Sequence, residues 1–346
     1  MRKLAGLFSD WESCRVGLED FFVREGISEK SLGYYRERIQ NFDPEKVLAA
    51  LASRDIGVLY ADDELFPSQV LEIHQAPLLL YYRGDVSLLS RAMLGVVGTR
   101  KMSDYGRRAT EKLVAELAPY FLIVSGMAEG IDTVAHRTTL EAGHPTVSVV
   151  GTGLDVVYPT SNTGLFGEII SNGVVLSEFP LGVSGLAYRF PQRNRIVSGL
   201  CQGLLVVEAG EKSGSLITAR LAMEENRDVF VVPGSIFSPL TYGNHRLIQD
   251  GAKLVMSYED VVTEFSYLIK PARMSPKSEK IIGPDWELTE SEQKIWDALG
   301  VASVSLDALV DKTELDIAQV LQSLTVFEVR GLVEQISGQG FRKQAY

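Results

Sequence analysis

Residues 94–124 read LGVVGTRKMSDYGRRATEKLVAELAPYFLIV. A short apolar run at Leu94–Val97 precedes an amphipathic helical pattern at Arg107–Leu117, and a second apolar run follows at Phe121–Val124. Short apolar strands separated by helices are typical of βαβ units, in which parallel strands are buried on both faces. This stretch therefore predicts the first unit of a parallel α/β sheet.

The same alternation continues to about residue 256. Helical patterns such as 133–141 and 216–226 separate further apolar runs, which lie at 146–150, 174–176, 204–207, 229–232 and 253–256. We expect an extended Rossmann-like domain with a doubly wound, mostly parallel sheet. In such a sheet, ligands bind on the loops that follow the carboxyl ends of the strands.

The flanking segments predict three further parts of the chain. Residues 1–60 are acidic and helical in pattern, and predict a small helical N-terminal domain (SAM-like or helix-hairpin-helix-like) before a Rossmann domain at 61–269. Residues 270–284 hold three prolines and four basic residues and predict a linker. Residues 285–346 show three short helical patterns and a hairpin, which predict a winged-helix domain.

The distribution of charge limits where a polyanion can bind. The chain has 346 residues and a net charge of −11, so it has no general basic surface. Residues 95–257 carry 14 basic and 15 acidic side chains, whereas residues 285–346 carry 5 and 11. Because non-specific affinity for polyanions comes from cations, we expect any such ligand in the middle of the chain.

Composition also argues against several classes of protein. No apolar stretch reaches the roughly 18 residues that span a bilayer, and the N-terminal residues lack the apolar core of a signal peptide. Cys14 and Cys201 lie far apart, so no disulfide framework is expected. The histidines and cysteines show no ligand-like spacing. We therefore predict a cytoplasmic protein with no membrane segment, no metal and no cofactor.

Several loops that follow predicted strands carry residues suited to phosphate. Glycines allow close backbone approach, and free amides and hydroxyls at helix N-termini bind anions. The candidate residues are Gly98, Arg100, Ser125, Gly126, Lys212, Ser213, Gly214 and Ser215. Each could instead form an ordinary helix cap or tight turn, but their place on one rim predicts a phosphate-binding surface.

The segment FPQRNR at 190–195 predicts a loop with an anion site at Arg193, Asn194 and Arg195, and Phe190 could offer a stacking face. We expect that replacing both arginines weakens binding of a phosphate ligand without unfolding the protein. The alternative is that one or both arginines only pair with carboxylates such as Glu178 or Glu208.

The sequence gives less support for an enzymatic function. The P-loop pattern G-x-x-x-x-G-K-[ST] and the dinucleotide pattern G-x-G-x-x-G after the first strand are both absent. Asp132 and His136 have helical i,i+4 spacing and could act as acid and base. In the other reading, Asp132 caps a helix and His136 is a structural residue. We predict no catalytic residues.

Together these segments resemble the DNA processing protein A family, also called DprA or Smf. The resemblance runs in order from about Phe66 to Leu254 and rests on GTR and SDYG (98–106), SGMAEGID and AH (125–136), GTGLD and YP (151–159), FPQRNRIVSG (190–199), SGSLITA (213–219), VPG (232–234), and HRLI and GA (245–252). Lys212 and Tyr242 depart from the family's usual residues.

The resemblance implies a protein that binds single-stranded DNA without sequence preference and is not an enzyme. It also implies a homodimer, with His245, Leu247 and Leu254 near the interface, and a role in loading the RecA recombinase during natural transformation. A nucleotide-binding sensor and a nucleotide phosphoribohydrolase are the alternatives. The hydrolase motif P-G-G-x-G-T-x-x-E ends in a carboxylate, but Thr218 is followed here by Ala219-Arg220-Leu221.

The predicted third helix of the tail, at about 313–329, is unsuited to duplex DNA. It contains Glu314, Asp316 and Glu328 and no basic residue. We therefore expect residues 285–346 to contact protein or to regulate binding.

Overall fold

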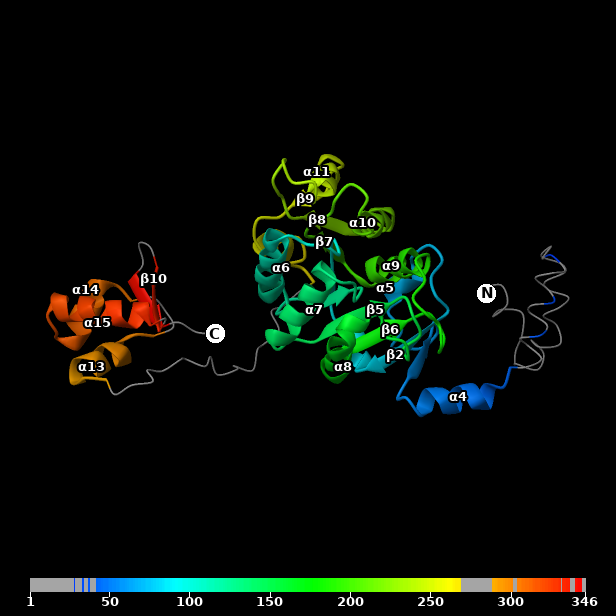
Figure 1. The fold of residues 1–346 in the computed structure, drawn as a ribbon, viewed down its shortest axis with the longest axis horizontal. Coiled ribbons are helices and arrows are strands. Elements are labelled where there is room, and N and C mark those ends of the chain that lie inside the picture. Colours follow the sequence, from blue (N-terminus) through cyan, green and yellow to red (C-terminus); the bar gives the residue numbers. More distant parts are fainter. Residues whose placement is uncertain are drawn as a thin grey trace. The chain divides into compact units, whose positions relative to one another are not determined.

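The computed structural model describes residues 42–268, 288–300, 304–330, 332–336 and 340–343, together with residues 28, 33 and 37. The chain divides into two compact units, Met1–Ala272 and Arg273–Tyr346 (Figure 1). Most of the helical domain expected at 1–60 lies outside the described residues, as does the whole linker expected at 270–284.

Within residues 42–268, nine strands form one sheet in the order β1-β2-β6-β5-β4-β3-β7-β8-β9. The strands from β6 to β9 in this order are parallel to their neighbours, whereas β2 is antiparallel to both β1 and β6. Their bounds are β1 Gly57–Tyr60, β2 Leu79–Gly84, β3 Met93–Val97, β4 Leu122–Ser125, β5 Thr146–Val150, β6 Val174–Ser177, β7 Gly203–Val206, β8 Asp228–Val231 and β9 Lys253–Leu254. The predicted extended Rossmann-like sheet is confirmed.

Most helices of this unit connect successive strands, whereas α4 precedes β1 and α12 follows β9. The helices are α4 Pro44–Ala52, α5 Ser68–Leu71, α6 Asp104–Leu117, α7 Ile131–Glu141, α8 Thr163–Asn172, α9 Arg189–Leu200, α10 Ser215–Glu224, α11 Tyr242–Gln249 and α12 Glu259–Val262, with short 3₁₀ turns η1 Val86–Ser90 and η2 Thr160–Asn162. Helices α6 and α7 pack against each other, as do α9 and α10.

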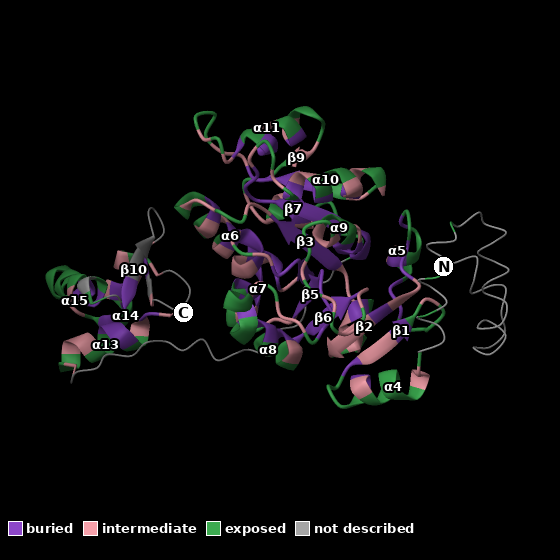
Figure 2. Cartoon of the chain, turned by 45° about the vertical axis from the view of Figure 1, so that its right-hand side comes forward, coloured by how far each residue is buried: buried purple, intermediate pink, exposed green. Residues whose placement is uncertain are grey.

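Strands β3 to β7 are buried along their whole length (Figure 2), whereas β1, β2 and β9 are only partly buried. In β3, Leu94 and Val96 join the cluster that contains residues of α6 and α7, whereas Met93 and Val97 join the one that contains residues of α9 and α10. Successive side chains of a strand point to opposite faces, so an unbroken apolar run can fill two cores at once. This explains why the parallel strands could be predicted as apolar runs.

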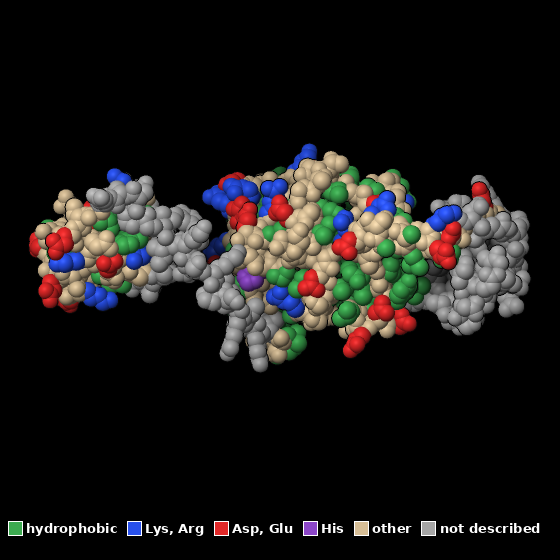
Figure 3. All heavy atoms as spheres, turned by 90° about the horizontal axis from the view of Figure 1, so that it is seen from below, with side chains coloured by type: hydrophobic (Ala, Val, Ile, Leu, Met, Phe, Trp, Pro, Cys, Tyr) green, Lys and Arg blue, Asp and Glu red, His purple; other side chains and the backbone are tan. Residues whose placement is uncertain are grey.

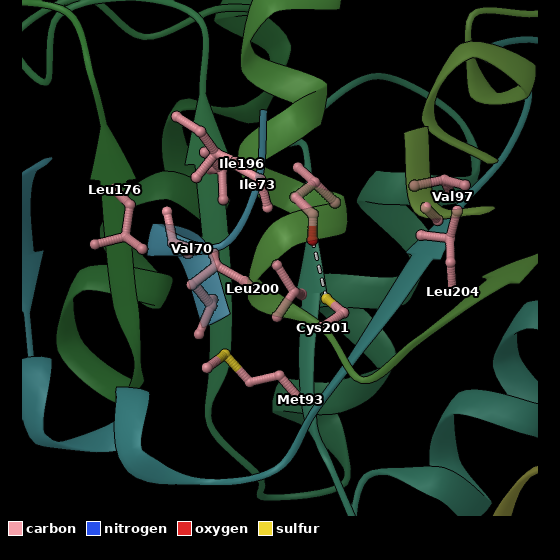
Figure 4. Packing of buried hydrophobic residues seen from close by; sticks show 14 of the residues in the cluster. Val70, Ile73, Met93, Val97, Leu176, Ile196, Leu200, Cys201 and Leu204 are labelled. Atoms are coloured by element: carbon pink, nitrogen blue, oxygen red, sulfur yellow. Dashed lines mark hydrogen bonds between the residues drawn. The ribbon is translucent and has the colours of Figure 1, made fainter. Parts of the chain in front are cut away.

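Helix α9 anchors one of these cores through its C-terminal half (Figure 4). Ile196 and Leu200 are fully buried against residues of β3 and β7, such as Met93 and Leu204. Cys201 follows the helix, and its thiol donates a hydrogen bond to the Val197 carbonyl oxygen at 3.0 Å. Burial raises the pKa of the Cys201 thiol, so this cysteine is a packing residue rather than a reactive one.

The segment 190–195 lies in the first two turns of α9, so its prediction as a loop was wrong. Pro191 suggested a loop, but proline is tolerated in the first helical turn because no intrahelical partner is needed for its nitrogen there. As a result, side chains of this segment point in different directions around the helix.

Strand β1 also differs from the expectation. The predicted helical domain ended at residue 60, but Gly57–Tyr60 pairs antiparallel with β2 and belongs to the large sheet. Leu59 is buried in its core. Such a short edge strand carries little periodic signal, and its pairing depends on a strand more than twenty residues away.

The second unit contains α13 Glu290–Ala298, α14 Leu306–Thr313 and α15 Ile317–Val329, followed by the hairpin of β10 Val333–Ile336 and β11 Gly340–Lys343. Its core includes Ile295, Leu309, Leu324 and Phe327. The three helices and hairpin expected in the tail are confirmed. None of the helices in the described parts of either unit has the length and apolar character needed to cross a membrane.

Buried His136 of α7 makes the stability of this fold dependent on pH. Its Nδ1 lies 2.8 Å from Thr146 Oγ1, which itself donates to the Ile123 carbonyl oxygen, so Nδ1 carries the proton. Burial, with a smaller effect from Arg193, lowers the pKa of His136 from 6.5 to about 3. Between these values the unfolded chain gains a proton that the folded protein excludes, so stability is lost as the pH falls.

We predict that lowering the pH from 6.5 to about 5 removes about 1.6 kcal/mol from the free energy of unfolding through this residue, because the slope approaches about 1.4 kcal/mol per pH unit only well below pH 6.5. Urea unfolding of the wild type and of His136→Gln at both pH values measures it. Between the two pH values, the free energy of unfolding of the wild type should fall by about 1.6 kcal/mol more than that of His136→Gln. Equal losses in the two proteins would contradict the assignment.

Candidate functional site

A pocket of about 480 Å³ opens beyond the carboxyl ends of the central strands. Loops after β3, β4 and β7 line it, together with the first turns of α9 and α10. The chain builds the sheet outward from β3 to β6 and then returns to place β7 beside β3. The pocket therefore lies at the topological switch point, where open α/β sheets bind their ligands.

Most of the residues predicted to bind phosphate line this pocket. They are Gly98, Arg100, Gly126, Phe190, Arg193, Asn194, Lys212, Ser213, Gly214 and Ser215. The structure thus brings together side chains that are more than 100 residues apart in the sequence.

Ser125 and Arg195 were also predicted to bind phosphate, but they do not line the pocket. Ser125 is fully buried, and its hydroxyl donates to the Val96 carbonyl oxygen at 2.7 Å. Arg195 Nη2 lies 2.6 and 2.5 Å from the two carboxylate oxygens of Glu178. For Arg195, therefore, the alternative of pairing with a carboxylate describes the structure.

Arg193 lines the pocket and supports the loop that follows β4. Its side chain is buried, and its Nη1 donates to the carbonyl oxygens of Gly126 and Val149. A Cβ atom at position 126 would lie 2.6 Å from the guanidinium, so only glycine allows this approach. Burial lowers the pKa of Arg193 to about 10, which leaves it cationic at neutral pH.

Asp132 holds the same loop from its other side. Its Oδ2 accepts hydrogen bonds from the amides of Gly126 at 3.1 Å and Ala128 at 3.3 Å. Burial raises the pKa of this carboxyl group, while Arg193 and the two amides oppose the rise. Because Asp132 binds these amides and His136 binds Thr146, both act as structural residues rather than as an acid–base pair.

Two exposed cations, Arg100 and Lys212, remain for a ligand, and neither forms an ion pair within the described residues. The Arg100 guanidinium lies 5.3 Å from the centre of the Phe190 ring, which holds it at the rim. On the face of the larger unit drawn in Figure 3, basic and acidic side chains are intermixed. The pocket is therefore a local concentration of cations on an acidic protein.

The N-terminus of α10 supplies neutral donors to the same pocket. The amides of Gly214 and Ser215 donate no hydrogen bond in the described part of the chain, and Gly214 provides no side-chain cap. Thr218 is only 2% exposed, yet its hydroxyl lines the pocket without a hydrogen-bond partner among the described residues. Thr218 was not among the ligands predicted from the sequence, although its position three residues after Ser215 places both on one helix face.

The fold and the pocket define a Rossmann-like α/β protein with a pocket lined by cations and glycine-rich loops at the switch point of its sheet. Within the described residues, no group of three or more histidine, cysteine or carboxylate side chains is placed to hold a metal ion. The family model of DNA recombination-mediator protein A matches residues 57–266, and that of the DprA winged helix domain matches residues 283–339. The chain belongs to the DprA/Smf family of DNA processing proteins.

Similar proteins cover much of the chain. DNA processing protein DprA of Streptococcus pneumoniae is 49% identical over 59% of this chain and 73% of its own length. Protein Smf of Synechocystis is 33% identical over 96% of this chain and 91% of its own length.

Two solved structures of the family are similar to this one. The X-ray structure of DprA from Streptococcus pneumoniae has a TM-score of 0.65 and 43% identity, over 71% of this chain and 86% of that one. A structure describing the single-stranded DNA binding mode of DNA processing protein A from Helicobacter pylori has a TM-score of 0.57 and 29% identity, over 62% of this chain and 97% of that one.

The buried contacts of Arg193 predict that this residue is needed for folding, contrary to the expectation that its replacement leaves the fold intact. We predict that Arg193→Ala lowers the free energy of unfolding by about 3–5 kcal/mol, because Asp132 and two carbonyl groups lose their buried partner. Exposed Arg100→Ala should change it by no more than about 0.5 kcal/mol. Denaturant unfolding measures both variants, and equal stability of the two would contradict this role.

Proposed function

We propose that this protein binds and protects single-stranded DNA, without sequence preference, in the pocket at the switch point. The observation that carries the proposal is the convergence of unused donors on one pocket. The free amides at Gly214 and Ser215 and the unpartnered Thr218 hydroxyl face the same space as Arg100 and Lys212. Amides, hydroxyls and cations together are the donors that bind phosphate groups.

The chemistry of the pocket favours phosphate over base recognition. Backbone amides and exposed cations bind phosphate oxygens, which are the same for every sequence. A pocket of about 480 Å³ has room for about one nucleotide of a strand and not for a duplex. The likeness to a Helicobacter pylori protein described as binding single-stranded DNA supports this ligand.

A nucleotide-binding sensor is the second candidate, and the volume of the pocket favours it because one nucleotide fills the space. A phosphoribohydrolase is less well supported, since Ala219 and Arg220 follow Thr218 where that motif continues toward a carboxylate. A strand that extends beyond the pocket makes more contacts than a mononucleotide. Binding of both ligands therefore separates a strand-binding protein from a sensor.

Homodimerisation and loading of the RecA recombinase during natural transformation complete the proposal. Strand β9 is an edge of the sheet, where Leu254 is 40% exposed and Met256 is 77% exposed. An apolar edge strand is a surface that proteins usually cover. Of the other residues expected at the dimer interface, His245 is half-buried, whereas Leu247 is buried in the core and offers no surface. The RecA role rests on family membership.

We assign protein contact or regulation, rather than duplex binding, to the winged-helix unit. Glu314, Asp316 and Glu328 are exposed on or beside α15, and the outer face of this helix also exposes Ile317 and Leu321. The acidic side chains at this position repel a duplex, and the exposed apolar side chains suit a protein partner.

We predict that Arg100→Ala and Lys212→Ala each weaken binding of a strand of about 20 nucleotides and lower the dependence of log K on log salt by about 0.7, because each removes one phosphate contact. Fluorescence anisotropy over a series of salt concentrations measures both quantities. Exposed Arg137→Ala, which lies outside the pocket, is the matched control. Wild-type affinity in both pocket variants would refute the proposed site, and a mononucleotide that binds as tightly as the strand would favour the sensor.

We also predict that deleting residues 285–346 leaves the affinity for a single strand within about threefold, or about 0.6 kcal/mol, because the pocket lies entirely in the first unit. The same anisotropy assay tests this deletion. A tenfold loss would show that the winged-helix unit contributes directly to strand binding.

A further inference from the structure

A strongly exposed apolar surface lies on the loop that joins β8 to α11. Within Ser235–Leu240, Ile236 is 81% exposed and Phe237 is 90% exposed. The loop borders the candidate DNA pocket, because Leu240 lines it together with Gly210. The Pro239 carbonyl oxygen lies only 3.2 Å from the position of a Cβ on Gly210, so the two loops are in contact.

Hydrogen bonds hold this loop in one conformation. The Thr241 hydroxyl lies 2.7 Å from the Ser235 carbonyl oxygen and 3.1 Å from that of Ser238, and donates to both. The Phe237 amide donates to Ser235 Oγ at 3.2 Å, and the Leu240 amide donates to Ser238 Oγ at 3.3 Å. The backbone therefore presents the ring of Phe237 to solvent as a fixed feature of the fold.

The two aromatic rings near the pocket differ in their availability. Phe190 already contacts Arg100 at 5.3 Å and Tyr158 at 5.3 Å, measured to ring centres. Phe237 has no ring or cation partner in the described segments of the chain. Of the two rings, Phe237 has the free face that an incoming planar group needs.

The position of Phe237 suits a base that lies outside the pocket. Leu240 is the third residue after Phe237, so their Cα atoms are at most about 11 Å apart. The pocket has room for about one nucleotide, and a bound strand must therefore continue over its rim. Residues 233–242 carry no charge, so they do not compete with Lys212 for the phosphates of the strand. A base can therefore stack on Phe237 while the neighbouring phosphates remain near Lys212.

We propose that Phe237, supported by Ile236, is a stacking platform for a base of a single strand that leaves the phosphate pocket. This proposal rests on the proposed function, since it assumes that the pocket holds the strand's phosphates. Aromatic stacking adds affinity without sequence preference, because every base presents a planar face. The platform would make affinity depend on strand length.

The test compares Phe237→Ala, Phe237→Trp and Tyr267→Ala with the wild type in the full-length chain. Tyr267 is the matched control, since this aromatic residue is 77% exposed but does not line the pocket. Phe237→Ala should weaken binding of a strand of about 20 nucleotides by roughly five- to tenfold and leave its salt dependence unchanged. Phe237→Trp should retain or exceed wild-type affinity, and Tyr267→Ala should match the wild type.

Binding of a mononucleotide should be the same for the wild type and Phe237→Ala, since a single nucleotide is held by the pocket alone. The proposal is overturned if Phe237→Ala binds the long strand normally or loses the same factor for both lengths. It is also overturned if light scattering shows that the variant alters the oligomeric state, because the ring then contacts a second copy. Failure of the proposed function gives a different pattern, in which Arg100→Ala and Lys212→Ala bind normally.

Discussion

The buried guanidinium of Arg193 is the interaction on which the geometry of the site depends. It joins the start of α9 to the loop after β4 through Gly126 and to β5 through Val149, and its charge interacts with that of Asp132. A buried charge is tolerated only when its donors are satisfied, so these partners fix one another. The position of the Gly126 loop, and with it the shape of the pocket, follows from this cluster.

The arginines that stabilise the fold differ from the cations proposed to bind a ligand, although both groups lie at or near the pocket. Arg193 donates to buried carbonyl groups and Arg195 pairs with Glu178, so both guanidinium groups serve contacts within the protein. Arg100 and Lys212 are exposed at the same pocket and remain available. An acidic protein can therefore present a confined set of cations without a basic surface, and the affinity of the proposed anion site would depend on neutral amides and hydroxyls as well as on charge.

The sheet and most of the pocket could be predicted because their signals are local. Apolar runs such as Leu94–Val97 are buried on both faces, and loops that end parallel strands must share one edge. The pairing of Arg195 with Glu178 and the burial of Arg193 could not be predicted, since they depend on tertiary contacts. Pro191 led to the wrong prediction of a loop at the start of α9. Thr218 and Phe237 were missed because the lack of a hydrogen-bond partner and the exposure of a ring can be read only from a structure.

Hydrogen exchange of backbone amides, with and without a saturating single strand of about 20 nucleotides, tests the central claim most directly. Bound phosphates should slow the exchange of the free amides at Gly214 and Ser215, and the loop at Gly126–Ala128 should also be protected. Residues 304–330 of the winged-helix unit should exchange at the same rate in both states. Protection confined to the winged-helix unit, with unchanged exchange at residues 210–218, would contradict this account.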